Sequence, residues 1–141
     1  MPNYPKISKL KTNDLFLDHL KSIDCEMPFT DNVDPTGALA SEIKTKQGLI
    51  GNRFCILPME GWDGTTDGRP TELTTRRWKN FGISGAKLIW GGEAVAVRPD
   101  GRANPNQLMM NESTVSEIAG LREALIGAHQ ERFGNTEDLQ W

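Results

Sequence analysis

Apolar side chains in the first forty residues follow a helical spacing in one segment. The stretch 11–23 predicts a helix, and Asn13 suits its N-terminal cap. The predicted inner face consists of Leu15, Phe16, His19, Leu20 and Ile23. Residues 24–41 contain prolines and a glycine that interrupt regular structure, so this stretch is predicted to be a loop.

The pattern then changes to extended chain. Residues 42–52 predict a short extended piece with a turn at Gly48 or Gly51. Residues 53–57 form an apolar run with large side chains, which predicts a buried strand. Pro58 has no N–H to donate to a sheet, so this strand is expected to end there.

A helix and a second strand follow after a glycine-rich loop. Residues 70–81 predict a helix, which Gly82 and Gly85 are expected to end. Its inner face is predicted to hold Leu73, Arg77, Trp78 and Phe81. Residues 86–90 predict the second strand, and residues 93–97 continue it after two glycines.

The longest helix is predicted near the C-terminus. Thr114 and Glu117 have the T-x-x-E spacing of a capping box, and Gly134 is expected to end the helix. The apolar stripe of this helix consists of Ile118, Leu121, Leu125, Ala128 and Phe133. Residues 135–141 lead into a third strand.

Strands and helices therefore alternate from residue 53 onward. Units of this spacing have right-handed crossovers and build a parallel sheet. The predicted fold class is α/β, as a partial TIM (β/α)8 barrel that contains its first two to three βα units in residues 42–141. Residues 1–41 are predicted to be an N-terminal extension of helix and loop. In such barrels the functional groups lie on the loops that follow the strands.

Charge and hydropathy exclude several classes of protein. The 141 residues contain 16 Lys and Arg against 19 Asp and Glu, which gives a net charge of −3. Without a basic excess to neutralise phosphates, we expect no nucleic-acid binding. No apolar stretch approaches the roughly 18 residues that cross a bilayer, and the N-terminus lacks the apolar segment of a secretory signal. We expect a cytoplasmic protein that does not bind membranes.

Cysteine and histidine offer little for metal or nucleophilic chemistry. Cys25 and Cys55 are thirty residues apart, and His19 and His129 have no second ligand at metal-binding spacing. We therefore expect no metal site. Cys55 lies within the apolar run of the first predicted strand, so it is expected to be a small buried side chain. The phosphate-loop, dinucleotide and nucleophile-elbow motifs are all missing from the sequence.

Four segments carry a combination of motifs in a fixed order. They read NRFCILPM at 52–59, DGRPTEL at 67–73, GAKLI at 85–89 and EAVAVRPDGR at 93–102. In order and spacing they resemble the old yellow enzyme family, the FMN-dependent NADH:flavin oxidoreductases. The resemblance covers about residues 42–138. It implies an FMN-binding β/α barrel that passes a hydride from NAD(P)H through FMN to an electron-poor small-molecule acceptor.

The resemblance also implies roles for individual residues. Pro58, Met59 and Glu60 match the positions that line the isoalloxazine ring of FMN in the family. The family usually has a Thr or Cys at the position of Glu60, as a hydrogen-bond donor to the flavin. An ionised Glu60 could not donate and would oppose negative charge on reduced flavin, whereas a protonated one could donate. Ala94 matches the small residue that lets the backbone approach the flavin; ordinary strand packing is the alternative. Trp62 either projects over the substrate side or folds its loop down.

Two readings of the whole chain stay open. A β/α barrel needs about 250 residues. The family's later groups, which include a substrate-binding His pair and a proton-donating Tyr, have no counterpart here, so no catalytic residue is assigned. We expect the N-terminal part of such an oxidoreductase, a fragment of a longer enzyme. The alternative is a non-catalytic α/β half-barrel module that self-associates as a homo-oligomer through its open sheet edges.

Overall fold

The computed structural model describes residues 4–141, which form two compact units. The first unit ends at Pro35, and the second covers Thr36–Trp141. The structure is mixed α/β, with three α-helices and two small two-stranded sheets, and these described residues contain no closed barrel. The α/β class predicted from the sequence is confirmed. Within the described residues, no helix combines the length and the apolar character needed to cross a membrane.

The first unit contains α1, which spans Asn13–Ser22. The helix predicted at this place is confirmed, but its cap is Thr12 rather than Asn13. Thr12 has extended backbone angles, and its side-chain oxygen accepts a hydrogen bond from the Leu15 N–H at 3.3 Å. Leu20 is the buried residue of this helix.

The second unit contains both sheets. The strands are β1 (Ile43–Lys44), β2 (Leu49–Ile50), β3 (Cys55–Ile56) and β4 (Leu88–Ile89). β1 and β2 form an antiparallel hairpin, as the predicted turn at Gly48 requires, and β3 pairs in parallel with β4. Leu88 also forms a parallel bridge with Gln140 on the other side of β4. The C-terminal residues thus reach the edge of β4, where a third strand is predicted, but within the described residues they form one isolated bridge and no strand.

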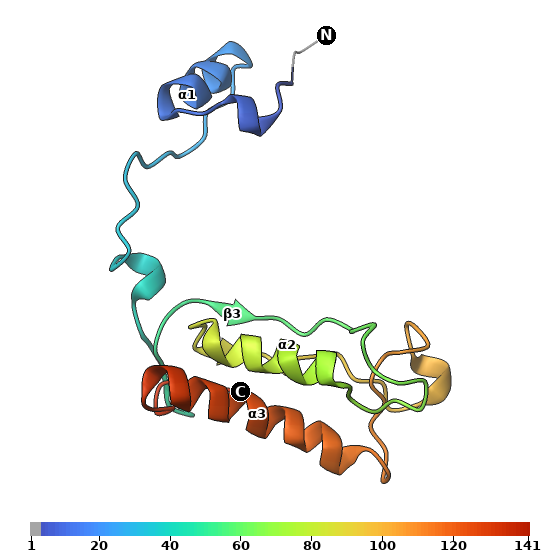
Figure 1. Cartoon of the computed structure of the whole chain (residues 1–141). Helices are drawn as coiled ribbons and strands as arrows, with labels where there is room; N and C mark the ends of the chain where they lie inside the picture. Colours follow the sequence, from blue (N-terminus) through green and yellow to red (C-terminus); the bar gives the residue numbers. More distant parts are fainter. Residues whose placement is uncertain (1–3) are drawn as a thin grey trace. The chain divides into compact units, whose positions relative to one another are not determined.

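Two helices cover one face of the parallel sheet. α2 spans Glu72–Ile83 and α3 spans Val115–Phe133. They pack side by side and run in the same direction, opposite to β3 (Figure 1). Short 3-10 helices complete the chain: η1 (Ile7–Lys9), η2 (Ala38–Ala40) and η3 (Pro99–Gly101). A strand followed by a returning helix is the arrangement that the sequence pattern predicts.

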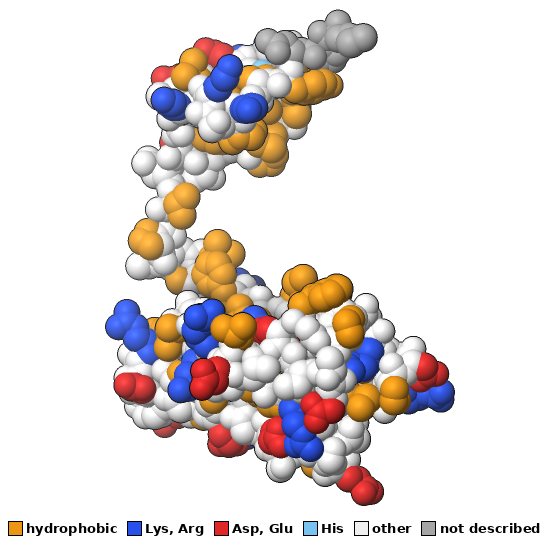
Figure 2. All heavy atoms as spheres, turned by 45° about the vertical axis from the view of Figure 1, so that its right-hand side comes forward, with side chains coloured by type: hydrophobic (Ala, Val, Ile, Leu, Met, Phe, Trp, Pro, Cys, Tyr) orange, Lys and Arg blue, Asp and Glu red, His pale blue; other side chains and the backbone are white. Residues whose placement is uncertain are grey.

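The hydrophobic core lies between the sheet and these two helices. Its buried members are Trp78, Ala86, Ile89, Leu108, Leu121, Leu125 and Leu139. Alternate residues of a strand point to opposite faces, so the neighbours of Ile56 and Ile89 point away from the core. Leu57 and Trp90 there are 67% and 64% exposed. Hydrophobic side chains are visible at the surface of both units among charged ones (Figure 2).

Cys55 does not have the buried environment predicted for it. Its side chain is exposed, because it points to the uncovered face of the sheet while Ile56 packs against the core. A parallel sheet is normally covered on both faces. The apolar run indicates the strand correctly, but one of its two faces is open in this chain.

The helix ends differ from the predicted ones in three places. α2 begins at Glu72, two residues after the predicted start at Pro70, and its cap Thr71 forms a capping box with Thr74. Gly82 lies inside α2, where it packs against α3. At α3 the predicted capping box is wrong, because the Thr114 hydroxyl donates to the Met109 carbonyl at 2.6 Å.

The second predicted strand is also shorter than expected. β4 ends at Ile89, and the stretch 93–97 contains one isolated bridge, between Ala96 and Met109. The two glycines before this stretch bend the chain out of the sheet instead of continuing it. This bend forms the candidate site.

Candidate functional site

A double turn after β4 brings two segments of the chain together. Gly91 and Gly92 have positive φ angles of 70° and 64°, which L side chains rarely adopt. A Cβ at Gly92 would lie 2.6 Å from the ring of Trp78, so only glycine fits. The turn returns Glu93 and Ala94 to the end of β3. Both segments lie beyond the carboxyl ends of the parallel strands, where α/β proteins place ligands.

The backbone joins the two segments at this end of the sheet. The Ala94 N–H donates a hydrogen bond to the Met59 carbonyl at 3.3 Å. The Met59 side chain is 71% exposed, Glu60 is also exposed, and Pro58 and Ala94 are half-buried. Four of the predicted site residues are therefore close in the structure.

Met59 and Glu60 also line a hollow of about 620 Å³. The other residues around it are Cys55, Ile56, Leu57, Gly61, Arg77, Phe81 and Gly92. Pro58, Trp62 and Ala94 are not among its lining residues. The Trp62 side chain is 67% exposed, so it does not fold its loop down onto the core.

Glu93 is the buried charge of the site. Its side chain is fully shielded from solvent, and both carboxylate oxygens accept hydrogen bonds. Oε1 accepts from the Gly61 N–H at 3.0 Å. Oε2 accepts from Arg77 Nη2 at 2.9 Å and from Trp78 Nε1 at 3.2 Å. One carboxylate thereby ties the loop after β3 to α2.

Arg77 carries this network to a second carboxylate. Its Nε and Nη2 donate to Asp63 at 3.0 and 2.6 Å. The hydrogen bonds from Arg77 hold the pKa of Asp63 below its usual range, and the Asp63 carboxylate raises the pKa of Arg77. Arg77 thus connects Asp63 and Glu93 in one cluster of two acidic side chains and one guanidinium.

Polar side chains from the next loop fix the same segment from the other side. Asn104 Nδ2 donates to the Gly61 carbonyl at 2.9 Å, and Asn106 Nδ2 donates to the Trp62 carbonyl at 3.4 Å. Gln107 Nε2 donates to the Ala94 carbonyl at 2.8 Å. Asn104 and Gln107 are themselves buried. The exposed Met59 and Trp62 side chains thus stand on a well-bonded backbone.

Sequence reasoning missed the three charged residues that build this cluster. Glu93 begins the segment 93–102, in which the next residue, Ala94, is the one predicted to line the site. Arg77 lies on the predicted inner face of α2 beside Trp78, and an arginine on an apolar face needs a buried partner. That pattern is a usable signal for Arg77. Asp63 lies in a glycine-rich loop, and no spacing connects it with Arg77.

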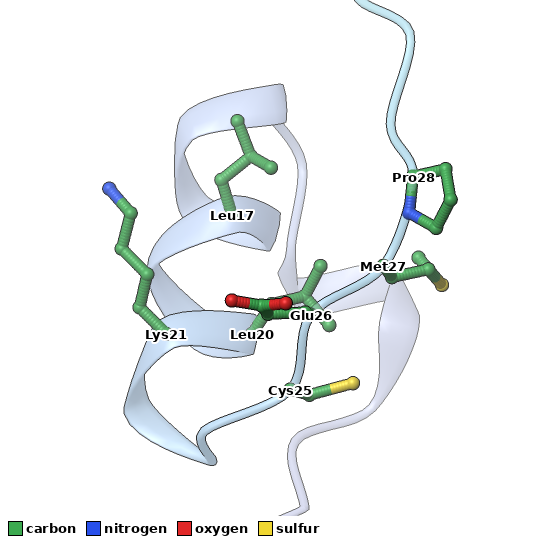
Figure 3. A pocket seen from close by; sticks show the side chains of 7 residues that line it. All are labelled: Leu17, Leu20, Lys21, Cys25, Glu26, Met27 and Pro28. Atoms are coloured by element: carbon green, nitrogen blue, oxygen red, sulfur yellow. The ribbon is translucent and has the colours of Figure 1, made fainter.

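Further hollows lie elsewhere in the chain, and two of them have a clear place in the fold. One, of about 500 Å³, lies in the first unit between α1 and the segment that follows it (Figure 3). Its chemistry is limited to the single groups of Lys21, Cys25 and Glu26. The other, of about 530 Å³, separates the β1–β2 hairpin from Trp90 and Trp141. Neither contains a residue of the predicted site.

Comparison with known proteins does not identify a family for the chain. No protein-family model matches it, and a search of curated proteins finds no match either.

Proposed function

We propose that this chain contributes the first part of an FMN-binding site in a cytoplasmic oxidoreductase of the old yellow enzyme type. On this proposal the parallel strands β3 and β4 are the first two strands of a β/α barrel, and the residues joined to β4 by Gln140 begin the third. When bound, FMN supplies the chemistry by taking a hydride from NAD(P)H and passing it to an electron-poor acceptor.

The observation that supports this most is the bond between the Ala94 N–H and the Met59 carbonyl. It joins the two sequence segments that resemble the flavin-facing motifs, at the carboxyl ends of neighbouring parallel strands. A site formed at this position from two strand ends is the usual arrangement in β/α barrels. The two segments are 35 residues apart in sequence, so their meeting is a property of the fold.

The residues present fit one part of FMN. Met59 and Trp62 offer exposed apolar side chains to a planar ring, and the fixed backbone between them limits the entropy lost on binding. None of the five predicted residues is basic, so the phosphate would be held by other residues. The Glu60 carboxylate accepts but does not donate when ionised, and it would oppose negative charge on reduced FMN.

An FMN titration of the whole chain tests the proposal. FMN fluorescence should be quenched to saturation, because a ring bound here would lie close to Trp62. Met59→Glu should weaken binding about tenfold, since it replaces an apolar contact with a charge that repels the phosphate. Ile83→Glu is the matched control, because Ile83 is also exposed, at 49%, and lies at the C-terminal end of α2, outside the predicted site. Absence of saturable quenching, or equal effects of both variants, would refute the proposal.

A second candidate function is self-association of a non-catalytic module. The observation that favours it is the open side of the parallel sheet. β3 pairs only with β4 among the strands of the described residues, and Leu57 and Trp90 are exposed on the face opposite the helices. Open strand edges and apolar sheet faces promote association between chains.

Sedimentation velocity over a range of concentrations tests this alternative. Self-association predicts a sedimentation coefficient that rises with concentration, and Leu57→Glu should return the chain to a monomer. Val33→Glu, at an exposed position of the first unit, should leave the association unchanged. A monomer at every concentration would eliminate the module hypothesis and leave the FMN site unaffected.

A further inference from the structure

Gly61 lies at the centre of the loop between Met59 and Trp62, and its peptide groups are held from two directions. The Glu93 Oε1 accepts the Gly61 N–H at 3.0 Å, and Asn104 Nδ2 donates to the Gly61 carbonyl at 2.9 Å. A Cβ at this position would collide with Arg77 Nη2, and it would lie 2.6 Å from Glu93 Oε1 and 2.8 Å from Asp63 Oδ1. The carboxylate therefore packs directly against a glycine backbone that no side chain separates from it.

The Glu93 carboxylate is placed for this role by two donors from α2. Arg77 Nη2 and Trp78 Nε1 both donate to its Oε2, which leaves Oε1 directed at Gly61. A buried carboxylate is stable only when such donors compensate its lost hydration. The same residue is followed by Ala94, whose N–H bonds the Met59 carbonyl. Glu93 thus acts on both segments of the proposed site.

We propose that Glu93 is a positioning residue that fixes the Met59–Trp62 turn in the shape that receives the flavin ring. The inference rests on the proposed FMN site. Glu93 is buried and would not touch the ring itself. Its effect passes through the Gly61 N–H on one side and the Ala94 backbone on the other.

Asp63 provides a matched control for this role. It is the other carboxylate bound to Arg77, and its removal also takes one negative charge from the cluster. Both carboxylates accept hydrogen bonds from Arg77. Asp63 also accepts from the Thr74 hydroxyl, whereas Glu93 also accepts from the Gly61 N–H. A purely structural role predicts similar consequences for Glu93→Gln and Asp63→Asn. A positioning role predicts that Glu93→Gln has the larger effect on Gly61 amide exchange and on FMN affinity.

Amide hydrogen exchange and FMN titration of the same chains test the inference together. In the unmodified chain the Gly61 amide should be protected to a degree similar to that of Trp90, whose N–H bonds the Ile56 carbonyl within the sheet. Glu93→Gln should speed Gly61 exchange about tenfold or more and weaken FMN binding about tenfold, the range for a lost bond to a charged group. Asp63→Asn should change both quantities less than Glu93→Gln does, because the acceptor of the Gly61 N–H stays in place.

The outcomes separate this inference from the proposed function. Rapid exchange of the Gly61 amide in the unmodified chain overturns the inference. This test needs no variant, so it stays decisive even if Glu93→Gln does not fold. FMN binding that Glu93→Gln and Asp63→Asn weaken equally also overturns it, while the FMN site stands. No FMN binding by the unmodified chain refutes the proposed function, and the inference that depends on it falls for that separate reason.

Discussion

Gly82 offers a direct test of the contact between α2 and α3. It is buried within α2, and a Cβ there would collide with the Leu125 carbonyl oxygen and lie 3.1 Å from the His129 nitrogen. Both are backbone atoms of α3, so no side-chain rotation relieves the overlap. Gly82→Ala must therefore push the two helices apart.

The expected magnitude follows from two opposing effects. Alanine in a helix interior is favoured over glycine by about 1 kcal/mol. Overpacking costs about 1–3 kcal/mol, and a collision with backbone belongs at the upper end of that range. The free energy of unfolding should therefore fall by about 2 kcal/mol in Gly82→Ala. Gly127→Ala in α3 is the control, because a Cβ there meets no atom within 4 Å. This substitution should raise the free energy of unfolding by about 1 kcal/mol.

Urea denaturation followed by tryptophan fluorescence measures both variants. All four tryptophans lie in the second unit, so the signal reports the unit that contains Gly82. The predicted midpoints move in opposite directions, lower for Gly82→Ala and higher for Gly127→Ala. If both substitutions stabilise the chain, the close packing of α2 against α3 is refuted.

Three further predictions concern other parts of the second unit. His129 Nδ1 lies 2.8 Å from the Gly82 carbonyl oxygen, and its Nε2 lies 3.0 Å from Lys87 Nζ. Burial lowers the pKa of His129 in the folded chain. The unfolded chain therefore takes up a proton at this histidine at a higher pH than the folded chain does. The urea midpoint should therefore decrease as the pH falls below about 6.5, and this decrease should be smaller in His129→Gln; a midpoint independent of pH would contradict it. Trp78→Ala should destabilise the unit by about 3–5 kcal/mol because Trp78 is buried. Trp62→Ala should change the free energy of unfolding by less than about 0.5 kcal/mol because Trp62 is exposed. Equal losses of stability in urea unfolding would contradict this difference in burial. Glu60→Gln should raise the reduction potential of bound FMN by removing a negative charge, and spectroelectrochemical titration that gives a lower potential would contradict this role.

The periodic segments could be predicted from the sequence because their apolar spacing matches their packing. Ile118, Leu121 and Leu125 recur at helical intervals, and all three are buried in α3. The alternation of strand and helix likewise indicates the parallel pairing of β3 with β4. These features depend on local patterns, which one sequence contains in full.

The parts that could not be predicted depend on contacts between distant residues. Cys55 is exposed because one face of its strand is uncovered, and no local pattern reports what covers a strand. Thr114 does not form the predicted capping box, because its hydroxyl donates a hydrogen bond to the Met109 carbonyl. The bond of Glu93 to Gly61 spans 32 residues and depends on the turn at two glycines. The site cluster is therefore a product of tertiary structure.

We propose that FMN binds where the loop after β3 meets Ala94. An NMR titration of the uniformly ¹⁵N-labelled chain with FMN tests it most directly, because each backbone amide reports separately. FMN binding at this place should give saturable shifts for the amides of Met59, Glu60 and Ala94 and leave those of α1 unchanged. Shifts confined to the β1–β2 hairpin, or no shifts at all, would contradict it.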